Sequence, residues 1–497
     1  MSKFINLDKY RYEPSENNTE NDVNDISILS DEQKQAYDLF KKGENIFLTG
    51  PGGTGKTKLV QYFSNYARNV SRKYQVCAMT GCAAILLNCN ARTLHSWSGI
   101  KLAKGTSKSV IDKVLCNKSA ISNWKRAKVL ILDEVSMLSK KIFEIIEKLA
   151  RIIRKIDLPF GGMQVVFCGD FCQLPPVGSY GEQDTFWFCF QSPLWKTVFP
   201  IQNHIVLKKI FRQNDPIYTN ILQNIRKGAI TKNDFNTLKA QVNKQYDAAK
   251  HNDCVPTKLF PLRAKADYYN KVMYSQLEGE ANTFELIKKA DNMLLENGKP
   301  IPFTVLEKCK KLKETEIEYE ITQLINNCPC VQVLHLKIGA AVMCNVNLDM
   351  DNGICNGSQG VVEEIIKIGE IPSIVVKFSN GITKCIGQYY WQSEDYPTIS
   401  IGQYPLCLCW ALTIHKIQGA TLDLAEIDVG TTVFEYGQTY VALSRVRSLD
   451  GLYLSAFEPE KIQTNPVVTS FYEEIDNLKK EVVLEKDISK DIKKIRL

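Results

Sequence analysis

A run of glycines that ends in Lys-Thr is the feature of this chain with the clearest chemistry. The run follows the apolar segment Ile46–Thr49 and precedes the helix-prone apolar segment 59–66. Glycines let the backbone wrap closely around phosphate groups, and the N–H groups at a helix start face the anion. This GxxxxGK[ST] spacing between a strand and a helix predicts a nucleoside triphosphate site. Its residues are Gly50, Pro51, Gly52, Gly53, Thr54, Gly55, Lys56 and Thr57.

An acidic pair, Asp133 and Glu134, follows a second apolar segment at 129–132. A strand that ends in two carboxylates supplies the magnesium-binding and water-activating groups that act with a phosphate loop. We expect Lys56 to reach the β- and γ-phosphates, and Thr57 and Asp133 to hold Mg²⁺, the latter through water. Glu134 is expected to orient or deprotonate the attacking water. The residues therefore predict hydrolysis of a nucleoside triphosphate.

The elements that must position these groups follow an α/β pattern. Short apolar segments at 46–49, 129–132 and 164–168 are expected to form strands of a mostly parallel sheet. Apolar residues spaced by three and four between 142 and 156 predict an amphipathic helix before the third strand. The region 330–395 differs, because it alternates apolar and polar residues around Asn-Gly turns. It is expected to be a small antiparallel β module.

The composition of the chain fits a folded protein with an anionic polymer as a partner. The 497 residues are 44% hydrophobic and carry a net charge of +7. Residues 1–27 have a net charge of −3 and few apolar positions, so we expect a disordered tail there. Residues 471–497 are neutral overall and are expected to be a charged, helix-prone tail. The remaining body has a net charge of +10, which suits nucleic acid.

The sixteen cysteines and the hydropathy profile indicate where in the cell the protein is found, rather than what it does. The cysteines are scattered through a long chain without a signal peptide, so we expect reduced thiols. No CxxC pair occurs and there are only five histidines, which disfavours a structural zinc site. No apolar run approaches the ~18 residues that span a bilayer. A soluble, intracellular protein without a membrane partner is expected.

Several further motifs occur in a fixed order between residues 29 and 457, and together they resemble the superfamily 1B DNA helicases. Within that group the chain resembles the Pif-type (petite integration frequency) family. The most diagnostic block is a helix followed by LPFGGMQ at 158–164 and CGDFCQLPPV at 168–177. Other matching motifs are LSDEQ at 29–33, AMTGCAA at 78–84, TLHSW at 93–97, FRQ at 211–213, ALTIHKIQGATL at 411–422 and YVALSRVR at 440–447. Ile417 departs from the family pattern, in which a small polar residue is usual.

The resemblance implies a fold of two RecA-like P-loop motor domains, the second interrupted by a small SH3-like β module. The first motor domain is expected at 28–198, with a small wedge subdomain near 99–126. The second is expected at 199–329 and 396–470, on either side of the module at 330–395. Segments 1–27 and 471–497 are the tails.

The resemblance also implies roles around the nucleotide. Gln33 is expected to recognise adenine, and Gly419 to lie at the nucleotide. Gln173 is expected to contact the γ-phosphate or the attacking water. Arg212 and Arg445 are expected to reach the γ-phosphate from the second motor domain when the cleft closes, which would couple hydrolysis to domain motion.

Single-stranded DNA is the expected polymer, held by hydroxyl and imidazole groups and by flat side chains. By resemblance Trp97 either stacks on a base or packs in the core. The basic stretch 101–128 is expected to hold the wedge that splits the duplex, or else to be a solvated face. The expected DNA contacts are Thr80, Thr93, His95, Ser96, Trp97 and His415.

The function implied is that of an ATP- and Mg²⁺-dependent DNA helicase that moves 5′→3′, in replication, repair or recombination. Its expected partners are single-stranded, duplex or forked DNA, with RNA–DNA hybrids as an alternative. A monomer is expected, in the nucleus or at a site of DNA replication, or in the cytoplasm if the protein is viral. Two further alternatives are a nucleic-acid scaffold with an inactive motor and a P-loop switch ATPase or GTPase. Intact catalytic residues argue against the first, and a second domain with its own arginine motifs argues against the second.

Overall fold

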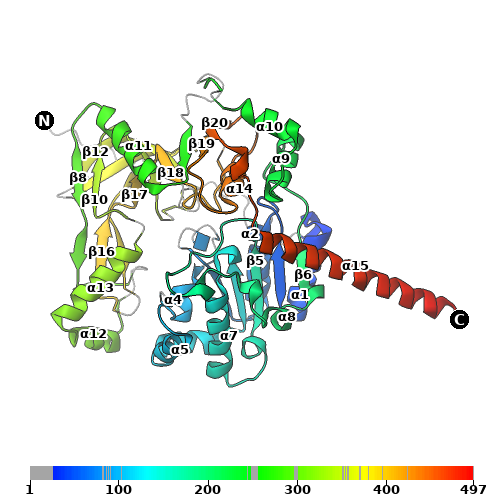
Figure 1. Ribbon diagram of the computed structural model, residues 1–497. Helices are drawn as coiled ribbons and strands as arrows, with labels where there is room; N and C mark the ends of the chain where they lie inside the picture. The colour runs from blue at the N-terminus through cyan, green and yellow to red at the C-terminus, as the bar shows by residue number, and fades with distance from the viewer. Residues whose placement is uncertain are drawn as a thin grey trace. The chain divides into compact units, whose positions relative to one another are not determined.

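The structure is a computed structural model, and it separates into two compact units (Figure 1). Residues 264–412 form the smaller unit, and the described residues up to 263 and from 413 onward form the larger one. The structure describes residues 26–495 except 81–82, 85–86, 88, 90, 102, 243, 248–255, 296–299, 329, 347, 350–351, 353, 355–357, 369–370, 379, 394–395 and 423. The side chains at 323, 326–327, 367–368, 371 and 481–495 are also outside this description.

A six-stranded parallel sheet forms the centre of the first half of the larger unit, with the strand order β3-β2-β4-β5-β1-β6. The three strands expected from the sequence are confirmed as β1, β4 and β5. Because all strands are parallel, their carboxyl ends meet at one edge, which is where α/β proteins bind ligands. The strands are β1 (Ile46–Thr49), β2 (Tyr74–Ala78), β3 (Arg92–Thr93), β4 (Val129–Asp133), β5 (Gln164–Gly169) and β6 (His204–Val206).

Alternation along β1 places side chains on both faces of this sheet. Ile46 and Leu48 pack into a cluster with Phe40 and Phe63 from the helices α1 and α2. Phe47 faces the opposite way and contacts Trp195 edge-on at a centroid distance of 5.1 Å. The amphipathic helix expected near 142–156 is confirmed as α7. The helices are α1 (Asp31–Lys42), α2 (Lys56–Asn69), α4 (Leu94–Ser98), α5 (Ser107–Leu115), α6 (Lys118–Arg126), α7 (Lys140–Arg154) and α8 (Trp195–Val198).

The second half of the larger unit contains a smaller parallel arrangement, in which β7 and β20 flank β19. The helix α14 leads directly into Ser444 and Arg445, so it fixes the position of that arginine. The elements are α9 (Pro216–Arg226), α10 (Lys232–Lys239), β7 (Thr257–Phe260), β19 (Ala425–Val429), α14 (Gln438–Leu443) and β20 (Leu452–Phe457). The strand β18 (Ala411–Thr413) lies where the chain passes from the smaller unit to the larger one.

The last element, α15 (Pro466–Ile495), is a helix that covers most of the segment expected to be a charged, helix-prone tail. Its first turns pack against the parallel sheet, as the red helix in Figure 1 shows. The Phe471 ring stacks on Phe190 at a centroid distance of 4.0 Å, and Ile475 is buried. Charge composition missed this contact because the apolar residues that make it are few and lie at the start of the segment.

The smaller unit contains the antiparallel β structure expected at 330–395, but its sheets extend beyond those bounds. A five-stranded sheet has the order β14-β13-β12-β11-β17, a three-stranded sheet the order β15-β16-β9, and β10 pairs with β8. Thus β8 and β9 come from before residue 330, and β16 and β17 from after residue 395. The Asn-Gly turn at 356–357 lies outside the described residues. The core of this unit includes Val342, Ile374 and Leu406.

The elements of the smaller unit are β8 (Asn282–Glu285), β9 (Ile287–Lys289), β10 (Val333–Leu336), β11 (Ala341–Cys344), β12 (Gln359–Ile368), β13 (Ile371–Phe378), β14 (Thr383–Ile386), β15 (Tyr389–Gln392), β16 (Ser400–Gln403) and β17 (Leu406–Leu408), together with the helices α11 (Arg263–Gln276), α12 (Phe303–Lys310) and α13 (Glu314–Asn327). No helix in the described ranges has both the length and the apolar character that crossing a bilayer requires. The expected tail at 1–27 lies almost wholly outside the described residues.

Candidate nucleotide and nucleic-acid site

A cavity of about 560 Å³ lies at the carboxyl edge of the six-stranded sheet. Its wall is built from distant parts of the larger unit and combines backbone N–H groups, carboxylates and arginines. This composition suits a bulky anion with a bound cation. The lining residues are Gly52, Gly53, Thr54, Gly55, Lys56, Thr57, Ala83, Leu87, Asp133, Glu134, Gln173, Phe211, Arg212, Asn214, Gly419, Thr421, Arg445 and Arg447.

The phosphate loop connects β1 to α2 as expected. Gly53 and Gly55 have φ values of +82° and +80°, a conformation that favours glycine. The Lys56 ammonium donates hydrogen bonds to the carbonyl oxygens of Gly50, at 2.7 Å, and Pro51, at 3.0 Å. Burial lowers the pKa of Lys56, although the carboxylates of Asp170, Glu134 and Asp133 oppose this shift. The lysine is therefore held inside the loop, where a phosphate would offer it stronger anionic partners.

The acidic pair lies at the end of β4, opposite the start of α2. Asp133 is only 6% exposed, and burial together with the charge of Glu134 raises the pKa of its carboxyl to about 7. The Thr57 hydroxyl hydrogen-bonds this carboxylate. Such a pair of hard oxygen groups at the wall of a cavity fits Mg²⁺, which binds one or two protein oxygens and completes its shell with water and phosphate.

Glu134 has a left-handed backbone conformation, with φ 55° and ψ 43°. Such strain in a non-glycine residue is typical of functional sites. Gln418 Nε2 donates a hydrogen bond to Glu134 Oε2 at 3.2 Å. Gln418 therefore positions Glu134, a role that the sequence analysis did not assign although the glutamine lies within a recognised motif.

Arg212 and Arg445 face the phosphate loop from the other side of the cavity. A carbon added at Gly52 would lie 3.5 Å from Arg212 Nη1 and 3.5 Å from Arg445 Nη2. In the described part of the chain, the hydrogen-bond partners of both guanidinium groups are carbonyl and hydroxyl oxygens rather than carboxylates. Burial and the charge of Arg445 lower the pKa of Arg212 to about 9. A half-buried and a buried cation beside a glycine-rich loop predict an anionic ligand between them.

Gln173 and Gly419 both line this cavity, as expected, but Gln33 does not. Gln173 is 5% exposed, and its Oε1 has no hydrogen-bond partner among the described residues. An acceptor of this kind suits a bound water. Gln33 donates to the Thr54 carbonyl at 3.3 Å and accepts from the Ser30 amide in the capping box of α1. It therefore supports the phosphate loop from behind.

Most of the residues expected to contact DNA lie near the ends of β2 and β3 and in α4, whereas His415 follows β18. Thr80 and Thr93 accept hydrogen bonds from the backbone amides of Ala83 and Ser96, so they also shape their own turns. Ser96 Oγ accepts from Arg92. Burial lowers the pKa of His95, which favours a neutral imidazole.

Trp97 is a correction to the expected DNA contacts. Its side chain is only 2% exposed, and its ring lies 4.6 Å from the ring of Trp124 in α6. The Trp124 indole donates in turn to the Ser98 carbonyl. The structure supports the alternative of core packing, because Trp97 anchors the basic stretch to α4 and offers no open ring face to a base.

An aromatic residue that the sequence analysis missed lies beside His415. The Phe434 ring is 60% exposed and nearly parallel to the His415 imidazole, at a centroid distance of 6.0 Å and an angle of 17°. Its backbone amide donates to Gln438 Oε1, which fixes the loop before α14. A lone Phe between motifs gives no clear signal in a single sequence.

The basic stretch 101–128 is exposed at its charged positions. The helices α5 and α6 bury Val110, Val114 and Trp124, and direct their lysines outward. The exposed cations are Lys101, Lys104, Lys108, Lys113, Lys118, Lys125, Arg126 and Lys128. No group of three or more His, Cys, Asp or Glu side chains suited to a metal is present within the described ranges.

Comparisons with known protein families match both units of the chain. The family model described as PIF1-like helicase matches residues 28–236, and the model of the DNA helicase Pif1 2B domain matches residues 321–365. The chain is 34% identical to an ATP-dependent DNA helicase PIF1 of Xenopus laevis, over 90% of this chain and 64% of that protein. It is 31% identical to the ATP-dependent DNA helicase RRM3 of Saccharomyces cerevisiae, over 91% of this chain and 68% of that protein. The chain thus spans about two thirds of the length of these curated relatives.

Solved structures agree with these matches. The crystal structure of Pif1 helicase from Candida albicans aligns with a TM-score of 0.71 and 30% identity, over 90% of this chain and 99% of that chain. Pif1 helicase from Bacteroides in complex with ADP-AlF3 and single-stranded DNA aligns with a TM-score of 0.64 and 27% identity, over 90% of this chain and 98% of that chain. The expected α/β fold with RecA-like domains is confirmed.

Proposed function

Because this chain belongs to the PIF1-like helicase family, we propose that it is an ATP-dependent DNA helicase that moves 5′→3′ along single strands and displaces duplex DNA. The observation that carries this proposal is a pair of arginines, half-buried Arg212 and buried Arg445, which face the phosphate loop across one cavity. Cations that a second domain delivers to the transferring phosphoryl group would couple hydrolysis to domain motion, which a motor needs.

The phosphate loop and the acidic pair are proposed to bind ATP with Mg²⁺. Lys56 would release its two carbonyl partners and bind the β- and γ-phosphates. Thr57 and Asp133 would hold the cation, whose charge lowers the energy of the developing phosphate charge. Gln33 would hold the loop through the Thr54 carbonyl, and its expected contact with the adenine remains a proposal from the motif alone.

Water activation is proposed for Glu134 and Gln173. Glu134 is fixed by its backbone turn and by Gln418, so its carboxylate is preorganised to accept a proton. The unpartnered Gln173 oxygen would accept a hydrogen bond from the attacking water. Both groups line the cavity together with the arginines, which would stabilise the charge of the transferring phosphoryl group.

The DNA path is proposed to follow Thr80, Thr93, His95 and Ser96 in the first motor domain and His415 in the second. Exposed Phe434, stacked on His415, is added as a base-stacking group. The exposed cations of 101–128 would meet duplex phosphates at a fork. The Bacteroides complex contains single-stranded DNA, which supports this choice of polymer.

We also propose the substrates, the oligomeric state and the cellular role of this activity. We include forked DNA as a substrate, RNA–DNA hybrids as a second substrate, and action as a monomer. The protein is also proposed to act in replication, repair or recombination, at an intracellular site of DNA synthesis. The basic body of the chain supports a nucleic acid as the partner.

Strand displacement on two matched duplexes tests the proposal directly. One duplex carries a 5′ single-stranded tail and the other a 3′ tail, both with ATP and Mg²⁺. We expect displacement of the 5′-tailed duplex alone. Lys56→Ala, which removes the phosphate ligand, should abolish hydrolysis and displacement but leave salt-sensitive single-strand binding intact.

The alternatives give different results in this assay. Displacement of the 3′-tailed duplex would contradict the direction. DNA-stimulated hydrolysis without displacement of either duplex would favour an RNA-containing substrate or a remodeller that needs a partner. Binding without any hydrolysis would support an inactive scaffold. Loss of both hydrolysis and DNA binding in a folded Lys56→Ala variant would contradict separate phosphate and strand sites.

A further inference from the structure

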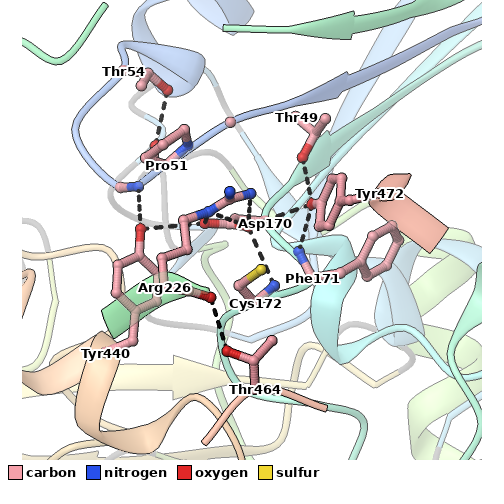
Figure 2. A network of polar contacts seen from close by, with 12 residues as sticks. Thr49, Pro51, Thr54, Asp170, Phe171, Cys172, Arg226, Tyr440, Thr464 and Tyr472 are labelled. Carbon is pink, nitrogen blue, oxygen red and sulfur yellow. Dashed lines mark hydrogen bonds and ion pairs between the residues drawn. The ribbon is translucent and has the colours of Figure 1, made fainter. Parts of the chain in front are cut away.

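A buried polar network next to the nucleotide cavity connects the two halves of the larger unit with the C-terminal helix (Figure 2). Its centre is the Asp170 carboxylate, which follows β5 and is fully buried. Arg226, at the end of α9, donates to this carboxylate from Nη2 at 2.8 Å and from Nε at 2.9 Å. Burial opposes ionisation of Asp170, but the charge and hydrogen bonds of Arg226 outweigh it, so its pKa is lowered. The pair is thus a fixed, ionised anchor.

Two tyrosine hydroxyls complete the shell of Asp170. Tyr440 of α14 lies 3.3 Å from Asp170 Oδ2, and Tyr472 of α15 lies 3.4 Å from Asp170 Oδ1. The Arg226 guanidinium lies over the Tyr472 ring, 5.0 Å from its centroid. One carboxylate therefore joins elements from before residue 200, from the second half of the unit and from the C-terminal helix.

The direction of the Tyr440 hydrogen bonds is fixed by donor counting. The Gly52 amide in the phosphate loop donates to the Tyr440 oxygen at 2.9 Å. The tyrosine has a single proton, and an ionised Asp170 can only accept. Tyr440 therefore donates to Asp170 while it accepts from the loop, and this polarised chain is stronger than either bond alone.

Tyr472 makes an analogous set of contacts on the other side of Asp170. Its oxygen accepts from the Phe171 amide at 3.1 Å and lies 2.7 Å from the Thr49 hydroxyl, at the end of β1. Thr49 directly precedes the phosphate loop. The C-terminal helix therefore contacts the chain at the ends of β1 and β5, beside the cavity.

Neither tyrosine is among the residues that line the cavity, yet Tyr440 controls a residue that does. Arg445 is tied to α14 because its Nε donates to the Val441 carbonyl at 2.9 Å. The Tyr440–Gly52 bond thus sets the distance between α14, with its arginine, and the phosphate loop. A transition state depends on such placement more than a bound ground state does.

We propose that Tyr440 is a positioning residue that holds Arg445 in register with the phosphate loop, and that Tyr472 of the C-terminal helix supports it through Asp170. This inference rests on the proposed ATP hydrolysis. It makes α15 part of the apparatus that couples the two motor halves, because the helix supports the same carboxylate that receives the Tyr440 proton.

Tyr440→Phe tests the proposal with little change in shape. We expect kcat of DNA-stimulated ATP hydrolysis to fall about tenfold, the effect of one hydrogen bond on a rate, while KM for ATP changes less than about twofold. Tyr472→Phe should lower kcat by about threefold, since it acts through Asp170. The double variant should be no slower than Tyr440→Phe alone, because the two residues act in series.

Tyr404→Phe is the matched control, since it removes a buried hydroxyl that donates to the Pro372 carbonyl in the smaller unit. It should lower the melting temperature without changing kcat. A Tyr440→Phe enzyme with wild-type kcat, or a double variant whose losses multiply, would overturn the network. A wild-type enzyme without ATP hydrolysis would contradict the proposed function itself, and with it the positioning role.

Discussion

Arg445 is a buried cation that lines the nucleotide cavity. Its guanidinium is buried, and its described partners are neutral oxygens. An anion that enters the cavity therefore interacts with the whole positive charge of Arg445. We expect Arg445→Ala to keep KM for ATP near the wild-type value while kcat falls by about 10³-fold, the contribution of an arginine that stabilises phosphoryl transfer. Steady-state hydrolysis with and without DNA measures both constants.

Arg445→Lys distinguishes chemistry from folding in this prediction. Lysine keeps the charge but has no planar fork of donors, so it cannot replace the bonds to Val441, Ala420 and Ser444. It should also hydrolyse ATP slowly while melting closer to the wild type than the alanine variant. Wild-type turnover in either variant would remove Arg445 from the site.

Phe434 carries a prediction about the polymer. Stacking of a base on an aromatic ring contributes about 1–3 kcal/mol, so Phe434→Ala should weaken binding of an oligo-dT strand by about 5- to 150-fold. The DNA-free rate of ATP hydrolysis should not change, because Phe434 does not line the nucleotide cavity. Fluorescence anisotropy of a labelled oligonucleotide gives the affinity.

Tyr180→Ala is the control for this variant, because that side chain is also an exposed aromatic of the larger unit but lies outside the motifs that the DNA contacts share. Equal losses in both variants would show a general effect of exposed aromatic rings. An unchanged affinity for Phe434→Ala would contradict the stacking role.

The residue roles that the sequence predicted are those with a fixed spacing to an element end. Lys56 begins α2, Asp133 ends β4 and Gln173 lies in the turn that follows β5, so the motif also predicts their position. Trp97 could not be placed, because the same aromatic residue suits a base or a core, and only its partner Trp124 decides between them.

At the scale of elements, the parallel strands were predictable because each is a local apolar segment with a functional turn after it. The extent of the antiparallel unit was not, because β8 pairs with β10 and β9 with β16 across more than 40 residues of chain. Such pairing depends on side chains that are distant in sequence. The docking of α15 was missed because the few apolar residues that make it lie at the start of a charged segment.

The start of α15 therefore carries a prediction about stability. Phe471 contacts Phe47, Phe171 and Trp195, as well as stacking on Phe190. Phe471→Ala should lower the free energy of unfolding of the larger unit by about 3 kcal/mol, the usual cost of removing a packed phenyl ring. Urea unfolding followed by fluorescence measures this change.

Val467→Ala on the same helix is the matched control, because that side chain is 43% exposed. It should change the free energy of unfolding by less than about 0.5 kcal/mol. Equal destabilisation by both substitutions would contradict a specific packing role of the Phe471 ring, because alanine favours the helix at both positions. No effect of Phe471→Ala would show that α15 does not stabilise the larger unit.

At the scale of the whole molecule, distant segments of the sequence together form one cavity and together give the chain its net positive charge. The phosphate loop and Arg445 are almost 400 residues apart, so their meeting depends on the complete larger unit. The net charge of +10 outside the terminal segments is likewise a property of the whole body. It predicts DNA affinity that falls with salt, whichever surface binds the strand.

The exposed cations of α5 and α6 allow the duplex part of this charge effect to be isolated. Each duplex phosphate contact contributes about 0.9 to the slope of log affinity against log salt concentration. If the basic stretch meets the duplex at a fork, the double variant Lys108→Gln/Lys113→Gln should flatten that slope by about 2 on forked DNA and leave it unchanged on oligo-dT.

The charge-matched control is Lys232→Gln/Lys239→Gln, two exposed lysines of α10. An equal change on both DNA substrates would place Lys108 and Lys113 on the single-strand path, and no change on either would make the stretch a solvated face.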